Sequence, residues 1–449
     1  MLTILKLLHI ALLVLLGSAS VAIAANSEPA AAYTLKQAVD YALENNPNLQ
    51  MTHERIQQAE AQVGIAKASF YPQVTSRLTY EYSDNPSRAF GMIIAQRRLN
   101  FSGTDFNHPG GVNNYRPEVM ASYSLYNGGQ DTALSKAAEL GVTGVALQDS
   151  ATRNQLIEAV TSAFYAILAA QEAHAIAERA INAVQSELKQ SQFRFDAGTL
   201  LKSDLLSLRV KLSEAQDAEI QTANGIDLAK TALKTLLGLT VNDPLAIAET
   251  SIWTVSPKSP SFTTLLEQAL AQRPEVQAAA LHVAIAEQHL KAAQGAHLPK
   301  ADAYVSYGSD SKDLAYSTNR DNVTAGVTVE MPIFSGFATS ERINKAQSQL
   351  TEAQMSVKNV QLSIENDVKT AHLHLNSALA RLDVTANAVT AAEEALRLVN
   401  EQRNAGVETV TRYIEAEVAR DQAHSRVIAA RYDALRAEAN LNQAVGYWK

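Results

Sequence analysis

Residues 43–49, LENNPNL, recur as residues 270–276, LAQRPEV, and this repeat decides the fold. Pro72 recurs as Pro299 at the same offset of 227 residues. Further along, FDAGT at 195–199 recurs as RNAGV at 403–407 at an offset of 208, so the first copy carries 19 extra residues between Pro72 and Gly128. The chain therefore contains two copies of one unit, which is typical of a structural assembly and rare among enzymes.

Each copy is predicted to be a long helix, two short strands, a very long helix, a tight turn and another long helix. The first copy spans residues 34–240, with strands at about 73–83 and 116–126 and its turn at about 195–199. The second spans 262–449, with strands at about 300–308 and 322–331 and its turn at about 403–407, and an equatorial linker at 241–261 joins the copies. The longest helices, from Gln130 to Asp196 and from Phe337 to Asn404, contain no proline and reach on the order of 100 Å.

The predicted strands alternate between apolar and polar side chains with a period of two, as expected of a transmembrane barrel wall. In the first strand, Thr75, Arg77, Thr79 and Glu81 oppose an apolar set made of Val74, Leu78, Tyr80 and Tyr82. A closed membrane barrel needs about eight strands. Four strands are too few, so several chains must contribute, and three copies would supply twelve strands.

The N-terminus and the composition place the protein outside the cytoplasm. Residues 1–24 combine Lys6, an apolar run and small residues ending at Ala24, which predicts a secretory signal peptide. Without it, 37 basic residues face 46 acidic ones, a formal charge of −9, which argues against a nucleic-acid partner. The chain has no cysteine, so its stability must come from packing.

Patterns that carry chemistry are missing from the sequence. It contains no Gly-x-Ser-x-Gly, no phosphate-binding loop and no histidine–glutamate zinc motif. His372 and His374 would point about 200° apart on a helix, so this pair does not predict a metal site. We therefore expect no enzymatic activity, no cofactor and no metal.

Taken in order, these elements resemble the TolC-like outer-membrane efflux protein family over nearly the whole mature chain. The junctions that carry the resemblance are Pro72, Pro299 and the strand-to-helix segment around Pro332, together with the turn that contains Gly198. The resemblance implies a mostly α fold with a small β part: a homotrimer whose twelve-stranded barrel lies in the lipid of the bacterial outer membrane and continues into a periplasmic coiled-coil tunnel. It also implies a passive exit duct that works with a periplasmic adaptor (membrane fusion protein) and an inner-membrane pump or ABC exporter.

In that family the two helix-to-helix turns form the periplasmic tip, where adaptors dock. The resemblance assigns docking to seven turn residues, which are Arg194, Phe195, Gly198, Thr199, Arg403, Gly406 and Val407. Four charged residues are the gate candidates: Asp204, Glu408, Arg412 and Glu415. A ring of carboxylates would favour cations, and an ion pair between Arg412 and an acidic neighbour such as Glu408 would hold the tip closed.

Two questions stay open at this level. A periplasmic coiled-coil adaptor or scaffold without a pore is the alternative, although an adaptor is expected to have one helical hairpin instead of two. The loop at 84–115 also carries an apolar run, Phe90 to Ile94, that is unusual for a solvated tip and is expected to fold over the mouth or touch a neighbouring subunit.

Overall fold

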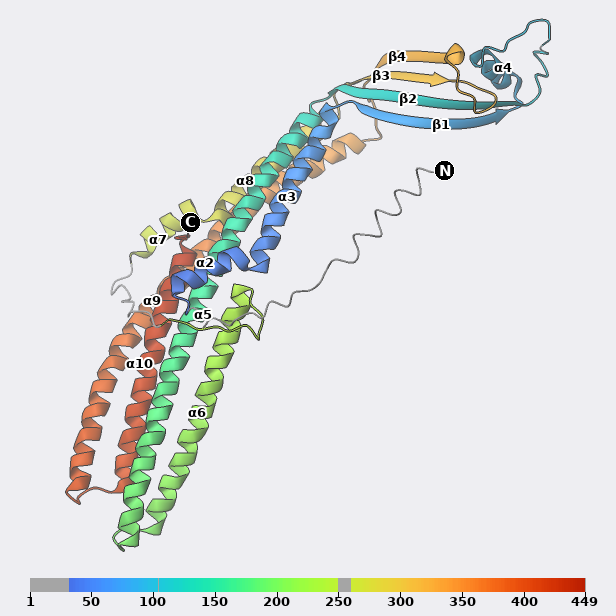
Figure 1. The fold of residues 1–449 in the computed structure, drawn as a ribbon. Helices are drawn as coiled ribbons and strands as arrows, with labels where there is room; N and C mark the ends of the chain where they lie inside the picture. Colours follow the sequence, from blue (N-terminus) through green and yellow to red (C-terminus); the bar gives the residue numbers. More distant parts are fainter. Residues whose placement is uncertain (1–31, 104, 249–259, 449) are drawn as a thin grey trace, which may run out of the picture.

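The computed structural model describes residues 32–103, 105–248 and 260–448, and it shows a long helical body with a four-stranded sheet at one end (Figure 1). The predicted signal peptide and residues 249–259 of the predicted linker lie outside the described residues. The first copy contains α2 (Leu35–Asn45), α3 (Pro47–Lys67), β1 (Gln73–Ser83), α4 (Pro86–Ala95), β2 (Val112–Asn127), α5 (Gln130–Asp196) and α6 (Lys202–Leu237). The second contains α7 (Phe262–Gln272), α8 (Pro274–Gly295), β3 (Lys300–Ser309), β4 (Asp321–Glu330), α9 (Ala338–Asn404) and α10 (Val410–Ala444).

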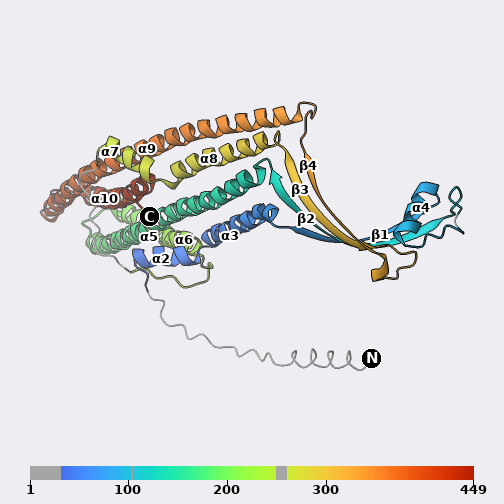
Figure 2. The same cartoon turned by 90° about the horizontal axis from the view of Figure 1, so that it is seen from above.

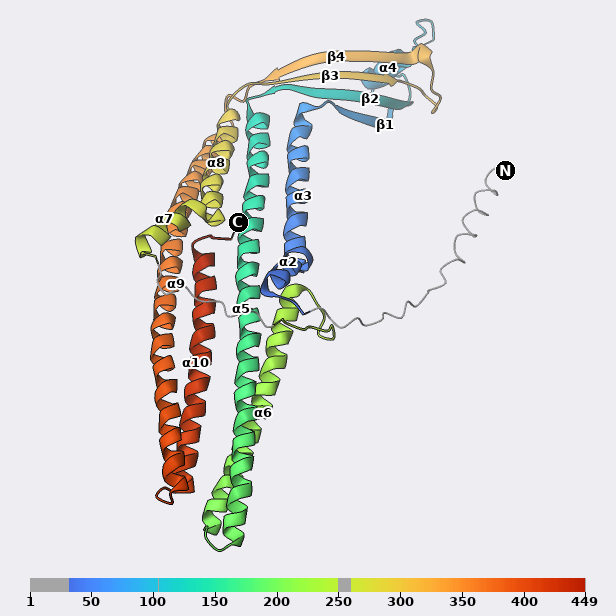
Figure 3. The same ribbon diagram turned by 60° about the vertical axis from the view of Figure 1, so that its left-hand side comes forward.

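The helices form a curved single layer. Near the sheet the order across the layer is α3, α5, α8 and α9 (Figure 2). Towards the far end it is α6, α5, α10 and α9, because α6 and α10 replace α3 and α8 beside the two very long helices (Figure 3). Both α5 and α9 run the full length of the body with 67 residues each. The protomer is therefore an arc with an open edge on each side.

The sheet is antiparallel in the order β1-β2-β3-β4, so both hairpins and the two copies join in one wall. The register places Tyr80 opposite Tyr115 and Val305 opposite Ala121, which gives one apolar face. Arg77 lies opposite Glu118, and Ser306 opposite Thr324, on the polar face. The alternation predicted from the sequence thus separates the two faces of the sheet.

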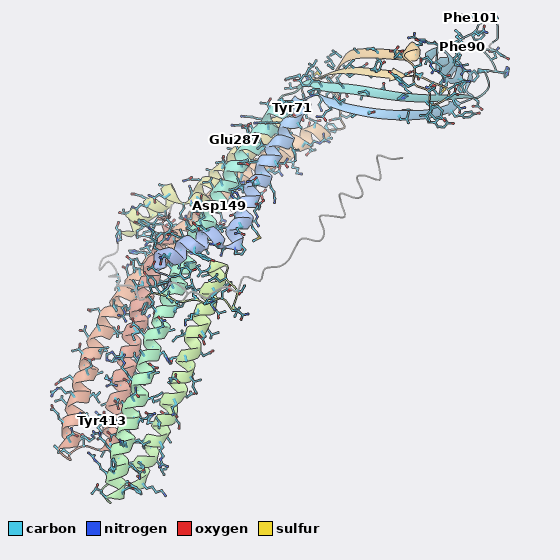
Figure 4. All side chains as sticks on the ribbon, viewed as in Figure 1. Tyr71, Phe90, Phe101, Asp149, Glu287 and Tyr413 are labelled. Carbon is cyan, nitrogen blue, oxygen red and sulfur yellow. The ribbon has the colours of Figure 1, made fainter. Side chains whose placement is uncertain are left out.

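Most of the packing lies at the level where the short helices meet the long ones. Phe164 and Ile167 of α5 are fully buried against α2 and α6, and a second cluster joins α7 to α9 around Val368. A hydrogen bond from Thr52 of α3 to Asp149 of α5 lies close to this level (Figure 4). The residues of α5 that pack here, among them Leu156 and Val160, lie on one face of the helix.

Prolines and a pair of glycines mark the helix–strand junctions. Pro72 and Pro299 each precede the first residue of a strand, and Pro332 follows the end of β4. Gly128 and Gly295 cross so closely that a Cβ on Gly128 would lie 2.1 Å from the carbonyl oxygen of Gly295. Only glycine fits at this crossing.

The largest difference from the sequence-based expectation lies in the loop between β1 and β2. Residues 84–115 were expected to be loop, yet they contain the helix α4 and the first four residues of β2, which begins at Val112. The helix begins with a hydrogen-bonding cap at Asn85 and proline at its first position. This Asn-Pro pair is a local helix-start signal that the sequence analysis passed over.

Candidate functional site

The two turns at the far end of the helical body have the same geometry. In each, the glycine adopts a left-handed conformation, with φ of 78° at Gly198 and 80° at Gly406. The following residue donates back to the helix, from Thr199 N to Arg194 O at 2.9 Å and from Val407 N to Gln402 O at 2.9 Å. These bonds form the six-to-one link of a Schellman motif. The motif lets a very long helix reverse within a few residues.

A buried ion pair joins the two hairpins just above these turns. The guanidinium of Arg403, at the end of α9, donates to the carboxylate of Glu187 on α5, and the two side chains are 7% and 5% exposed. Ser191 Oγ donates to the other carboxylate oxygen at 3.2 Å. Arg403 also lies over the ring of Tyr413 from α10, with 4.1 Å between the guanidinium carbon and the ring centroid. Three helices therefore meet at one charged cluster, near the Tyr413 label in Figure 4.

A second buried carboxylate lies one turn along α10 from Tyr413. Burial raises the pKa of the Glu417 carboxyl, and the nearest cation is Arg420, whose Nη2 lies 3.6 Å away. Burial, followed by the charge of Glu417, raises the pKa of the Tyr413 hydroxyl. Arg420 also pairs with Asp421 of its own helix at 2.6 Å, whereas the Arg403–Glu187 pair joins two helices.

The gate candidates predicted from the sequence lie on the outside of this cluster. Arg412 pairs with Glu415 on its own helix at 3.0 Å, and both side chains are well exposed, at 58% and 60%. Its predicted partner Glu408 accepts a bond from Thr409 N instead. Asp204 is half-buried in the first turn of α6, where a negative charge is favourable beside the helix N-terminus.

The docking candidates divide into exposed and buried residues. Arg194, Gly198, Thr199, Gly406 and Val407 are exposed at the turns, and Phe195 is half-buried. Arg403 is buried, so the structure does not present it at the turn surface. The exposed aromatic ring at the first turn belongs to Phe193, which the sequence analysis did not select. Phe193 lies in the last turn of α5, three residues before the helix ends at Asp196, and nothing in the local sequence marked it.

A groove of about 480 Å³ runs up from this end between the hairpins, lined by α5, α6 and α10. Its floor is largely apolar and includes Ile176, Val184, Ile414 and Val418. Charged residues such as Lys211, Glu214 and Asp421 lie along it. The groove has the composition of a seat for an amphipathic helix, with an apolar centre and a charged rim.

The two outermost helices each carry a second apolar stripe. On α9, exposed residues follow one line when placed at about 100° per residue: Met355, Leu362, Leu373, Val384 and Leu398. The buried residues Ile364, Val368 and Leu375 lie on the opposite side of the same helix. On α6, exposed Leu206, Val210, Ile220 and Leu228 likewise oppose the buried side. Each edge helix is therefore built to pack on two sides.

Over the described part of the chain, no helix is both long and apolar enough to cross a membrane. Within the same ranges, no three His, Asp or Glu side chains gather closely enough to hold a metal ion. At the tip, the buried Arg403–Glu187 pair joins α9 to α5, which is an arrangement for holding segments together.

Comparison with known proteins finds similar chains over more than nine-tenths of the sequence. A profile of the outer membrane efflux protein family matches residues 38–239 and 265–447. Outer membrane protein TolC of Vibrio cholerae is 24% identical over 92% of this chain and 91% of its own, and outer membrane efflux protein BepC of Brucella suis is 27% identical over 91% and 86%. Among solved structures, the Campylobacter jejuni CmeC outer membrane channel superposes with a TM-score of 0.78 at 18% identity, covering 92% of this chain and 85% of that one.

Proposed function

The chain belongs to the outer membrane efflux protein family, and from that premise we propose that three copies close into one duct, a twelve-stranded barrel continuous with a twelve-helix tunnel. Members of this family are channel proteins of the outer membrane rather than enzymes. The protein is an outer-membrane exit duct of an efflux or type I secretion system, with a large periplasmic part. The sequence-based alternative of a scaffold without a pore is set aside by this membership.

The observation that carries the threefold closure is the pair of open edges. β1 and β4 each have one ladder partner within the described residues, so their outer edges offer unpaired backbone groups. The helices that carry the exposed stripes, α6 and α9, lie on the same two sides of the arc (Figure 3). Joining β4 of one copy to β1 of the next would pair the open edges of the sheet. Joining α9 of the same copy to α6 of the next would bury the two exposed stripes in the helical body. A cyclic arrangement closes when each copy presents complementary edges in this way.

The test places a negative charge on the exposed apolar stripe of α9 in one variant and beside that stripe in a control variant. Leu362→Glu puts a carboxylate on the line of exposed apolar residues, and Ser363→Glu puts the same charge on the next residue, about 100° round α9. Burying an unpaired carboxylate costs several kcal/mol, so Leu362→Glu is expected to give monomers in detergent while Ser363→Glu stays trimeric. Light scattering gives the mass of the purified protein in detergent and so distinguishes monomers from trimers. A trimer that tolerates Leu362→Glu as well as Ser363→Glu would place the contact elsewhere.

The partners implied by the family are a periplasmic adaptor and an inner-membrane pump or ABC exporter. We place the adaptor at the tip, with its helical hairpin in the groove between α5, α6 and α10 and its end against the exposed turn residues Thr199 and Val407. The apolar floor and charged rim of the groove support this placement. Val418→Asp on the groove is expected to reduce capture of the adaptor, whereas Ser363→Glu on α9, away from both the groove and the exposed stripe, leaves capture unchanged.

The gate proposed for the tip is the cluster of Arg403, Glu187 and Tyr413. It joins the end of α9 to α5 and α10, so the hairpins cannot separate while the ion pair holds. Opening the duct then requires the hairpins to splay and the pair to break. The exposed Arg412–Glu415 pair lies within one helix and holds nothing across the hairpins.

A further inference from the structure

The loop between β1 and β2 belongs neither to the helical tunnel nor to the tip, so neither accounts for its structure. It lies at the end of the sheet farthest from Tyr413, as the labels of Phe90 and Phe101 show in Figure 4. It contains α4, and it carries the extra residues that distinguish the first copy from the second. The hairpin between β3 and β4 has no corresponding α-helix.

Helix α4 lies on the polar face of the sheet. Arg88 of α4 pairs with Glu81 of β1. Gln96 Nε2 donates to Asn113 O at 2.7 Å and to Asn114 Oδ1 at 2.9 Å. Glu81 and Asn114 are opposite each other in the ladder and belong to the same face as Arg116 and Glu118. In the proposed barrel this is the face that lines the interior, since the apolar face meets lipid.

A buried polar network fixes the helix to the strand ends. Asp310, 2% exposed, accepts from Asn114 Nδ2 at 2.6 Å, from Arg116 Nη1 at 3.2 Å and from Asn322 Nδ2 at 3.2 Å. Arg97, just after α4, donates from Nη2 to Asp321 O at 3.1 Å. It does so with φ of 51°, a left-handed conformation that costs a non-glycine residue about 1 kcal/mol. Such strain persists where surrounding contacts determine the conformation.

The side of the loop that points away from the strands is aromatic. Phe106 lies between Phe90 and Phe101, with ring centroids 5.0 Å and 6.4 Å away. Ile94, one turn after Phe90, is exposed, and Phe101 is 78% exposed. The opposite side of α4, with Ala89 and Met92, packs on Val112. The polar contacts therefore bind the wall and leave an apolar surface facing into the mouth.

The width of the mouth decides what covers that surface. Twelve strands spaced about 4.8 Å apart and tilted about 40° give a barrel roughly 25 Å across. A helix with its side chains is about 10 Å thick. Three helices held on the inner rim therefore span the opening and touch one another near the axis. Lipid is excluded there, so the neighbour available to each aromatic surface is the same surface of another copy.

We propose that the β1–β2 loop is a lid, and that three copies meet through Phe90, Ile94, Phe101 and Phe106 to close the external mouth of the idle duct. This rests on the proposed threefold duct. Hydrophobic constrictions stop hydrated solutes because water leaves a narrow apolar ring. The lid bars entry from outside, while the tip bars entry from the periplasm.

Cysteine cross-linking tests the meeting of the loops, since the natural chain contains no cysteine. Phe101→Cys places a thiol on the lid, and the control Leu314→Cys places one in the β3–β4 loop, which lies beside Leu78 and Tyr115 on the apolar face. Full-length protein in native outer membranes is treated with an oxidant or a short bismaleimide. Covalent dimers are expected for Phe101→Cys and none for Leu314→Cys on a denaturing gel.

The outcomes separate the lid from the duct. If the protein is a trimer by mass and neither Phe101→Cys nor Phe90→Cys gives a cross-link, the proposed lid is wrong and the proposed duct stands. Monomers by mass overturn the duct and the lid together. As a second readout, replacing Phe90, Phe101 and Phe106 by serine is expected to raise single-channel conductance several-fold when the tip is opened by Arg403→Leu. An unchanged conductance in that background contradicts a constriction at the mouth.

Discussion

Removing Arg403 is the most direct test of what holds the tip together. The substitution Arg403→Leu leaves Glu187 as a buried carboxylate without its cation. Breaking a buried pair from one side costs about 3–5 kcal/mol, and every protomer of the proposed trimer loses the same amount. Even about 3 kcal/mol changes the ratio of released to held hairpins by more than about a hundredfold. The exposed Arg412–Glu415 pair is worth about 0.5 kcal/mol or less, so Arg412→Leu is the matched control.

The assay is single-channel recording in planar bilayers. Arg403→Leu is expected to give steady currents that are larger than those of the natural protein, although still limited by the external mouth, while Arg412→Leu keeps the small currents of the natural protein. Because the pair is buried, raising the salt concentration should open the natural channel little.

The double variant Glu187→Leu, Arg403→Leu removes both charges, and a buried pair replaced by apolar residues is often close to neutral. It is expected to return to small currents. Large currents in the double variant, or unchanged currents in a well-folded Arg403→Leu protein, would refute the role of this pair.

Three further measurements follow from local geometry. Glu417→Gln is expected to raise the melting temperature at pH 7, because burial raises the pKa of the Glu417 carboxyl above its ordinary value of 4.5. The folded protein therefore loses stability as the pH rises through the raised pKa and the buried carboxyl becomes charged. The gain from Glu417→Gln should fade as the pH is lowered towards 4.5, and a gain that is independent of pH would point to another cause. Gly295→Ala places a Cβ 2.4 Å from the carbonyl oxygen of Gly128 and should lower the free energy of unfolding by about 1–3 kcal/mol. Gly225→Ala adds a Cβ in open space on α6 and should raise the free energy of unfolding by about 0.5–1 kcal/mol. Thermal melts measure both changes. Thr409→Ala removes the side chain that caps α10 and should cost about 1 kcal/mol, while Thr411→Ala, inside the helix, should cost nothing; equal losses would show that the cap contributes little.

Local signals in the sequence account for the elements of the fold. The proline-free stretch from Gln130 to Asp196 gave a helix with the same bounds as α5, and the period-two pattern after Pro72 gave β1. Both patterns depend on residues a few positions apart, which is the range over which backbone geometry repeats. The helix α4 was missed because the apolar run of Phe90 to Ile94 was weighed without the capping signal at Asn85 and Pro86.

The contacts that matter at the tip had no such signal. Glu187 and Arg403 are 216 positions apart, and nothing near either residue indicates the other. Arg403 was selected because its turn matches that of Phe195, and its burial came from the packing of α9 against α10 and α5. Arg412 was selected for its charge, but in the structure it forms an ion pair with Glu415 of the same helix.

By itself, the sequence determined the duplication, the strand faces, the long helices and the glycine turns, because each of these is a repeating or local property of the chain. Only the tertiary structure decided which charges are buried together, on which face of the sheet α4 lies and which helices are left with an apolar stripe on an open edge. These depend on residues brought together from distant parts of the chain, where burial turns a weak surface pair into a strong constraint and leaves an exposed stripe for another copy to cover.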